Sequence, residues 1–169
     1  MRRRWHLTGG MTAGPLLFAW AFGAAALAQA PVPAAMPASL QGHLRAERLQ
    51  DVTSVRGLPL GVRDALQALF GASTLAIAEP GARFQATDVV EDPGLPARRL
   101  VLAGCGPDHC VVYYERGGFA HTWRAVLFHW TPTGTTAVAG GVAPRDLRSI
   151  DDVRNALLSG TVRAAGRDW

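Results

Sequence analysis

The stretch that decides the fold runs from residue 99 to residue 130 and reads RLVLAGCGPDHCVVYYERGGFAHTWRAVLFHW. Three runs rich in β-branched and aromatic residues alternate in it with two short turns that contain glycine. The runs cover residues 99–105, 110–115 and 120–130. Turns this short join antiparallel neighbours, because a parallel crossover needs a dozen or more residues. The stretch therefore predicts an antiparallel meander.

Further runs of strand-like composition lie on both sides of this stretch and are bounded by Pro and Gly. They cover residues 49–55, 74–78, 84–90 and 135–139. From residue 74 onward, no segment between the runs is long enough for a crossover helix, which again favours antiparallel pairing. We expect about five of these runs to form one sheet.

Two helices are expected to flank the meander. Apolar residues over 62–70 recur at helical spacing, Pro59 suits a helix start, and Gly71 suits a left-handed end. Near the C-terminus, Ser149 and Asp152 have the spacing of a capping box. The sequence predicts an α+β fold, an antiparallel β-meander of about five strands with an N-terminal and a C-terminal helix packed on one face.

The N-terminus is typical of an exported protein. Three arginines at 2–4 precede an apolar stretch over 14–27, which is short for a membrane span, and small residues follow. We expect a signal peptide, 1–28, cleaved after Ala28, because Pro31 disfavours the alternative cleavage site after Ala30. An uncleaved anchor is the alternative, and the pattern leaves open whether export is general secretory or twin-arginine.

Two regions are expected beyond the signal peptide. Residues 29–42 form a Pro/Ala-rich leader without a periodic apolar face, which indicates an extended, mobile segment. Residues 43–169 form a single α+β domain. We expect the mature protein to be periplasmic or secreted, with no stable membrane anchor after cleavage.

Charge excludes one class of partner. All 13 acidic residues but only 14 of the 17 basic residues, every one an arginine, lie beyond residue 28, so the mature chain carries a net charge of +1. No segment of it concentrates basic residues among aromatic ones. We therefore expect no nucleic-acid partner.

The turns set a predicted register. If Gly117 and Gly118 are the two central residues of a primed turn, Tyr114 lies opposite His121, and Trp123 points into the core. A four-residue loop over 106–109 places Cys105 opposite Cys110. The other sheet face then becomes a candidate binding face, and its members are Leu100, Leu102, Tyr113, Arg124, Val126 and Phe128.

Cys105 and Cys110 are the only cysteines of an exported chain, so we expect a disulfide between them. The alternatives are a redox-active pair, or a metal site in which the two thiolates join His109 and either His121 or His129. Export opposes reduced thiolates, and we expect neither a metal nor another cofactor. His109 is expected to hydrogen-bond with its neighbour Asp108.

Tyr114 and His121 form the candidate pocket. No G-x-S-x-G motif and no phosphate-binding glycine loop occur in the chain. The leading expectation is a non-enzymatic module that binds a protein or a small molecule. The alternative is a small periplasmic hydrolase or isomerase in which a pocket histidine, His121, works with a carboxylate.

Overall fold

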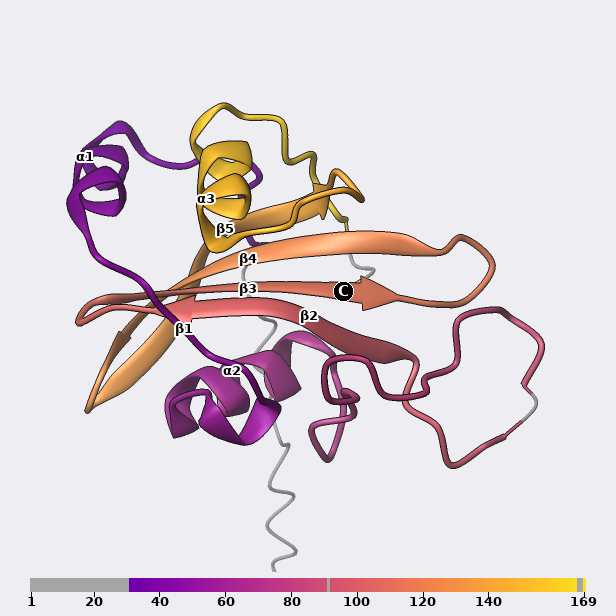
Figure 1. The fold of residues 1–169 in the computed structure, drawn as a ribbon. Coiled ribbons are helices and arrows are strands. Elements are labelled where there is room, and N and C mark those ends of the chain that lie inside the picture. Colours follow the sequence, from indigo (N-terminus) through magenta and orange to yellow (C-terminus); the bar gives the residue numbers. More distant parts are fainter. Residues whose placement is uncertain (1–30, 91, 167–168) are drawn as a thin grey trace, which may run out of the picture.

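A computed structural model describes residues 31–90, 92–166 and 169, which form an antiparallel sheet with helices on both faces (Figure 1). The expected signal peptide, 1–28, lies outside the described residues. The elements, in chain order, are helix α1 (Ala38–Ala46), strand β1 (Gln50–Asp51), the 3-10 helix η1 (Val55–Gly57), helix α2 (Leu60–Leu69), strands β2 (Arg98–Cys105), β3 (His109–Arg116), β4 (Thr122–Thr131) and β5 (Gly134–Ala143), and helix α3 (Ile150–Leu158).

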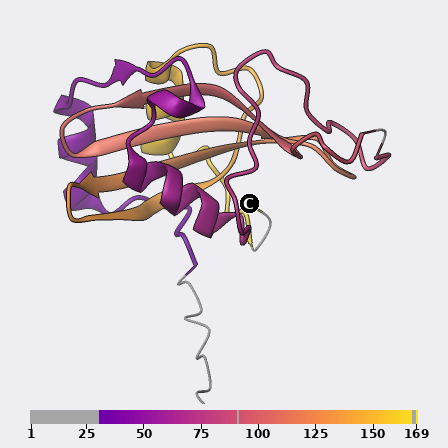
Figure 2. The same cartoon turned by 90° about the horizontal axis from the view of Figure 1, so that it is seen from below.

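The five strands lie in the sheet in the order in which they occur in the chain, and each pairs antiparallel with the next. This confirms the predicted α+β meander. Helices α1 and α3, at the two ends of the ordered region, lie on one face of the sheet (Figure 1). Helix α2, which is the N-terminal helix that the periodicity predicts, packs on the opposite face (Figure 2).

Both faces are covered because β3 is apolar on both sides. Its residues from His109 to Glu115 are all buried, and the run Val111-Val112-Tyr113-Tyr114 supplies two large apolar side chains to each face. On the α1/α3 face, the buried core consists of Met36, Leu44, Val111, Tyr113, Ala125, Leu127, Ala139, Ala143, Val153, Ala156, Leu157 and Val162. On the α2 face, it consists of Leu58, Val62, Leu66, Ile77, Leu100, Ala103, Cys110, Val112, Tyr114, Val126, Phe128 and Trp169.

The ends of the two expected helices agree with their sequence signals. Gly71 follows α2 with φ +63°, in the left-handed region. At α3, the Ser149 hydroxyl accepts a hydrogen bond from the Asp152 N–H, and the Asp152 carboxylate accepts one from the Ser149 N–H. The capping box is therefore complete. None of the helices over the described residues is long and apolar enough to cross a membrane.

The prediction of an extended, mobile leader over 29–42 is wrong for its second half, because helix α1 begins at Ala38. Leu44 of this helix is fully buried, and Met36 just before it is also part of the core. The carbonyl of Pro33 accepts a hydrogen bond from the N–H of Gly140 in β5. Leu44 is the one buried residue of α1, so tertiary contacts rather than a periodic apolar face hold the helix in place.

The runs over 74–78 and 84–90 were expected to be strands and are not. Ala78 forms only an isolated bridge to Arg99 at the edge of β2. Residues 84–90 pair with no strand of the sheet. They form part of a loop instead.

The predicted register between β3 and β4 is also wrong. Tyr114 lies opposite Arg124 rather than His121, a shift of three residues along β4, and an odd shift exchanges the two faces. Both types of primed two-residue turn need positive φ at the first central residue, here Gly117, but only Gly118 has it, with φ +114°. The connection is instead five residues long, 117–121.

The hairpin at the other end of β3 has the predicted register, with Cys105 opposite Cys110 and Ala103 opposite Val112. A bulge between Leu100 and Leu102 then shifts the pairing, so that Tyr114 lies opposite Leu100 and not Val101. The two hairpins place polar side chains at opposite ends of the sheet: Glu115 and His121 at one end, and His109 and His129 at the other.

Candidate functional site

The six residues of the predicted binding face do not share one face. Leu100, Arg124, Val126 and Phe128 point toward α2, whereas Leu102 and Tyr113 point toward α3. Five of the six are buried, and Leu102 is partly buried. The three-residue shift in register and the helix on each face account for both results. Both sheet faces are therefore part of the core rather than exposed surface.

The predicted Tyr114–His121 pocket is not formed either. Tyr114 is fully buried on the α2 face, where it contacts Phe70 edge to face at 5.4 Å between ring centroids. Burial raises the pKa of the Tyr114 hydroxyl. His121 is exposed and lies in the 117–121 connection. Tyr114 therefore belongs to the core, whereas His121 belongs to the connection between β3 and β4.

His121 has a carboxylate partner, which is Glu115 at the end of β3. The Nε2 atom of His121 lies 2.9 Å from Glu115 Oε2, and the Arg99 guanidinium donates to Glu115 Oε1 at 2.8 Å. Glu115 is 8% exposed, so both of its oxygens have partners where water is largely excluded. Arg99 and Glu115 are also direct cross-strand partners, which explains how the sheet holds this ion pair.

Aromatic rings hold the imidazole of His121 in place. It stacks on Trp123 with ring centroids 4.4 Å apart, and Phe84 lies 5.7 Å away on another side. The Arg99 guanidinium lies over the Phe84 ring at 4.5 Å. The imidazole and the guanidinium are therefore oriented by stacking as well as by Glu115.

The loop that carries Phe84 is fastened to the β3–β4 turn by its backbone. Gly118 N–H donates to the carbonyl of Ala86, and Gly117 N–H donates to that of Ala97. A Cβ atom at Gly117 would lie 1.9 Å from the backbone oxygen of Gln85, so only glycine allows this approach. We call residues 84–90 together with 115–121 the hairpin end.

An open pocket of about 470 Å³ lies at the hairpin end. Its lining residues are Arg83, Phe84, Gln85, Ala86, Thr87, Leu95, Arg99, Glu115 and His121. Three large apolar side chains of the hairpin end are exposed to solvent: Phe119 (96%), Val89 (64%) and Val90 (63%). Both views of the fold place the loop and the β3–β4 turn at the same end of the sheet (Figures 1 and 2). This end combines a polar pocket with exposed apolar surface.

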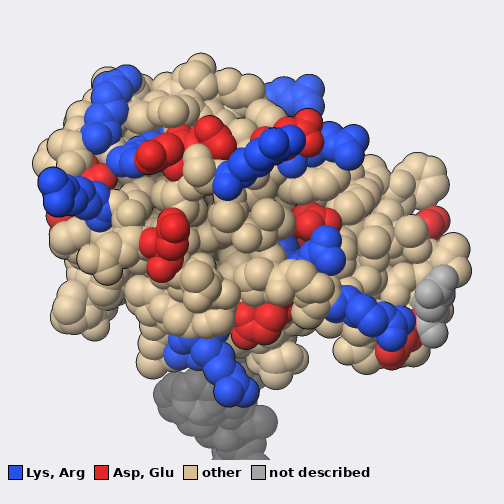
Figure 3. Space-filling view, viewed as in Figure 1, with Lys and Arg blue, Asp and Glu red and all other residues tan. Residues whose placement is uncertain are grey.

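The pocket carries a small excess of positive charge, because Arg83 and Arg99 face the single carboxylate of Glu115. Over the face of the molecule in Figure 3, arginines and acidic residues are interspersed, and no extended patch of one sign forms. This face therefore carries no strong long-range field of one sign.

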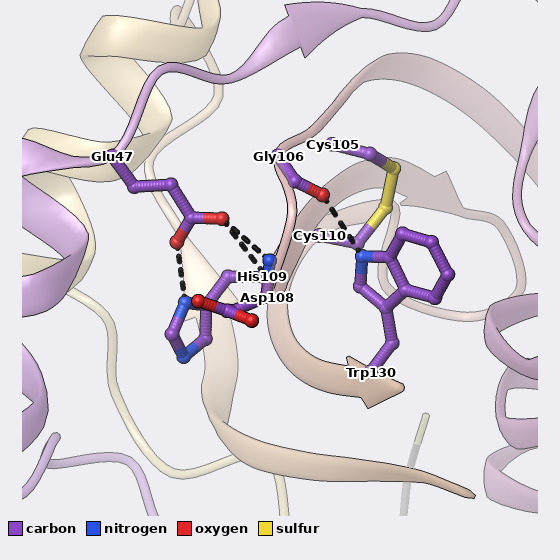
Figure 4. Close-up of a disulfide and its surroundings, with 7 residues drawn as sticks. All are labelled: Glu47, Cys105, Gly106, Asp108, His109, Cys110 and Trp130. Carbon is purple, nitrogen blue, oxygen red and sulfur yellow. Dashed lines mark hydrogen bonds and ion pairs between the residues drawn. A yellow bond between two sulfur atoms is a disulfide. The ribbon is translucent and has the colours of Figure 1, made fainter. Parts of the chain in front are cut away.

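The other end of the sheet holds the disulfide between Cys105 and Cys110, whose Cα atoms lie 4.1 Å apart (Figure 4). This confirms the predicted pairing. The loop between the two cysteines is capped by Glu47, which follows α1: Glu47 Oε1 accepts hydrogen bonds from the N–H groups of Asp108 and His109 at 2.8 and 3.0 Å. His109 was expected to bond to Asp108, but its Nδ1 lies 2.5 Å from Glu47 Oε2 instead.

Burial by itself would raise the pKa of Glu47. The hydrogen bonds from the backbone of Asp108 and from the side chain and backbone of His109 outweigh it, so the pKa of Glu47 lies below its ordinary value. The carboxylate is therefore ionised at neutral pH and serves as an acceptor for three N–H groups.

The sequence analysis did not identify Glu115 and Glu47, the two carboxylates that contact His121 and His109. A two-residue turn at Gly117 and Gly118 would place Glu115 and His121 on opposite sheet faces. Glu47 directly follows helix α1, which the sequence analysis does not predict. A signal existed for Glu115: Arg99, Glu115 and His121 flank the apolar runs at the same predicted end of the sheet.

The fold and its two ends define a small, disulfide-stapled α+β domain built on a five-stranded antiparallel meander. No protein-family model, no curated protein and no solved structure matches the chain. Among the described residues, no group of three or more His, Cys, Asp and Glu side chains is arranged to hold a metal ion.

Proposed function

We propose that this protein is an exported binding module, periplasmic or secreted, that contacts its partner through the hairpin end without catalysing a reaction. The observation that carries the proposal is that the hairpin end has an open pocket and also exposes the side chains of Phe119, Val89 and Val90. Exposed apolar surface next to polar groups is typical of contact sites, because its burial on binding is favourable.

Export is supported by two independent features. The N-terminal sequence has the charged, apolar and small-residue regions of a signal peptide in the right order. Cys105 and Cys110 form a disulfide, and disulfides persist in oxidising compartments such as the periplasm.

The pocket chemistry favours a ligand that carries a carboxylate next to an aromatic or aliphatic group. The Arg99 guanidinium is part of the pocket lining and is held in place by Glu115 and Phe84, so it presents oriented donors. Arg83 adds a second guanidinium. A carboxylate bound here would gain charge-assisted hydrogen bonds, while the apolar group of the ligand would cover the Phe84 side of the pocket.

A simple probe tests this proposal: N-acetylphenylalanine, which combines a carboxylate with an aromatic ring. We expect millimolar N-acetylphenylalanine to shift the ¹H–¹⁵N resonances of residues 84–87 and 115–121. The neutral N-acetylphenylalanine amide is the control ligand and should cause smaller shifts. Arg83→Gln should weaken the response, whereas the exposed Arg148→Gln, far from the pocket, should leave it unchanged.

Two results would contradict the proposal. Equal shifts with the acid and the amide would rule out recognition of a carboxylate. Shifts that map to another surface, or no shifts at all, would rule out the hairpin end as the binding site.

A second candidate function is a hydrolase or isomerase that uses His121 as a general base. The observation in its favour is the 2.9 Å contact between His121 Nε2 and Glu115, because a carboxylate that orients an imidazole in this way leaves the other ring nitrogen to accept a proton. Hydrolysis of p-nitrophenyl acetate tests it. A rate well above that of free imidazole, lost in His121→Gln, would support the enzyme over the binding module.

A further inference from the structure

His109 and His129 face each other at the disulfide end of the sheet, away from the hairpin end. They are direct cross-strand partners on β3 and β4, so both side chains lie on the same face. Their ring centroids are 5.2 Å apart. His109 is buried, with 4% of its surface exposed, whereas His129 is exposed.

Both imidazoles are anchored through Nδ1. His129 Nδ1 lies 3.1 Å from the carbonyl oxygen of Asp108, and His109 Nδ1 contacts the carboxylate of Glu47. A carbonyl and an ionised carboxylate can only accept hydrogen bonds, so in each neutral ring the proton stays on Nδ1. Each Nε2 atom therefore presents its lone pair.

The Nε2 atom of His109 has no hydrogen-bond partner among the described residues, although it is buried. It points away from Glu47 and from the disulfide (Figure 4). Buried polar atoms in proteins nearly always have a partner, and an unsatisfied one often indicates an ion or a water molecule. The ring of His109 that carries this lone pair is a close neighbour of the ring of His129, whose Nε2 can contribute a second one.

We propose that His109 and His129 bind a transition-metal cation such as Zn²⁺ through their Nε2 atoms, with water in the remaining coordination positions. Imidazole is a preferred ligand of Zn²⁺ and Cu²⁺, and metal-bound histidines usually donate their other ring N–H to a carboxylate or a carbonyl. Glu47 and the carbonyl of Asp108 supply these two acceptors.

The spacing of the rings suits such a site. With metal–nitrogen distances of about 2.0–2.1 Å and a tetrahedral angle, two bound imidazoles have their centroids roughly 5 Å apart. The observed separation is 5.2 Å. The cysteines take no part, because both belong to the disulfide.

Calorimetric titration of the metal-free protein with ZnCl₂, in a buffer that does not chelate zinc, tests the proposal. We expect one zinc ion to bind per chain and MgCl₂ to give no signal, because Mg²⁺ prefers oxygen ligands. His129→Gln removes an exposed ligand and should weaken zinc binding at least tenfold. Glu47→Gln removes the charged acceptor behind His109 and keeps both metal ligands, and it should weaken zinc binding about tenfold.

His121→Gln is the matched control, since it removes a histidine at the opposite end of the sheet, and zinc affinity should not change. Circular dichroism and the Tm of each variant establish that it is folded. No binding of zinc by the wild-type protein, or equal affinity in His129→Gln and the wild type, would overturn the proposal. Loss of zinc binding in His121→Gln alone would assign the metal to the hairpin end and overturn it as well.

Discussion

The carboxylate of Glu47, directly after helix α1, accepts hydrogen bonds from both the backbone N–H and the side chain of His109, which begins strand β3 62 residues later in the chain. The same carboxylate accepts the N–H of Asp108. One side chain thus ties α1 to the loop that the disulfide closes. No local sequence pattern predicts this contact, because its partners are far apart in the chain. Its loss should change the free energy of unfolding.

Glu47→Gln should lower the free energy of unfolding by about 1–3 kcal/mol at pH 7, because hydrogen bonds to a charged acceptor are the strong ones. The pKa of Glu47 in the folded protein lies below its ordinary value of 4.5. Its stabilising effect is therefore present above pH 4.5 and is lost as the pH falls through the lower, folded-state pKa. Urea unfolding at pH 7 and at pH 3 should show the gap between wild type and variant narrowing at pH 3. A gap of constant size would contradict this assignment.

Gly117→Ala should be strongly destabilising, since its Cβ would collide with the backbone of Gln85 and force the loop away from the β3–β4 turn. Gly134→Ala is the matched control, because a Cβ there meets nothing within 4 Å. We expect the Tm of Gly117→Ala to fall well below that of Gly134→Ala. Equal melting temperatures would mean that the loop does not pack against the turn.

Arg124→Ala tests the register between β3 and β4. The side chain is 4% exposed on the α2 face, so its removal should cost roughly 2–4 kcal/mol through lost packing and lost polar contacts. Arg56→Ala, at an exposed position of η1, should change stability by less than about 0.5 kcal/mol. Denaturant midpoints measure both. If Arg124→Ala behaves like Arg56→Ala, Arg124 points to solvent and the register is the one that a two-residue turn predicts.

Replacing Cys105 and Cys110 with alanine should lower the Tm modestly and leave the fold intact. The disulfide closes a very short loop, and the chain-entropy relation gives such a loop only about 2 kcal/mol. Glu47 and the cross-strand pairs hold the same hairpin independently. A thiol assay of the native wild-type protein should find no free thiols, and two free thiols would contradict the disulfide.

Gly42→Ala should stabilise the protein by about 0.5–1 kcal/mol, because Gly42 lies inside α1 and a Cβ there meets no atom within 4 Å. Leu44→Ala, two residues further on, should cost about 2–5 kcal/mol, because Leu44 is fully buried against the sheet. Thermal unfolding of both variants measures the effects. If neither variant changes the Tm, residues 38–46 are not helical and packed.

The elements with strong local signals could be predicted from the sequence. Helix α3 depends on a capping box that its own residues, Ser149 and Asp152, complete. The hairpin between β2 and β3 follows from a short loop with a cysteine at each end. In both cases the interacting groups are within six residues of each other, so a short stretch of sequence includes both partners of the interaction.

Tertiary structure alone decided the register of β4 and with it the candidate site. The N–H of Gly118 donates to the carbonyl of Ala86, and this contact between distant segments replaces the two-residue turn that the glycines suggest. His121 consequently meets Glu115 instead of Tyr114.

The sequence by itself determined the α+β class, the order of the main strands and the disulfide, because hydrophobic periodicity and turn chemistry are local properties. Which sheet face each helix covers, where α1 forms and which carboxylate reaches each histidine were decided only by the tertiary structure. The physical reason is that both faces of β3 are apolar, so local pattern does not distinguish them. Only the packing of α1, α2 and α3 against the complete sheet does.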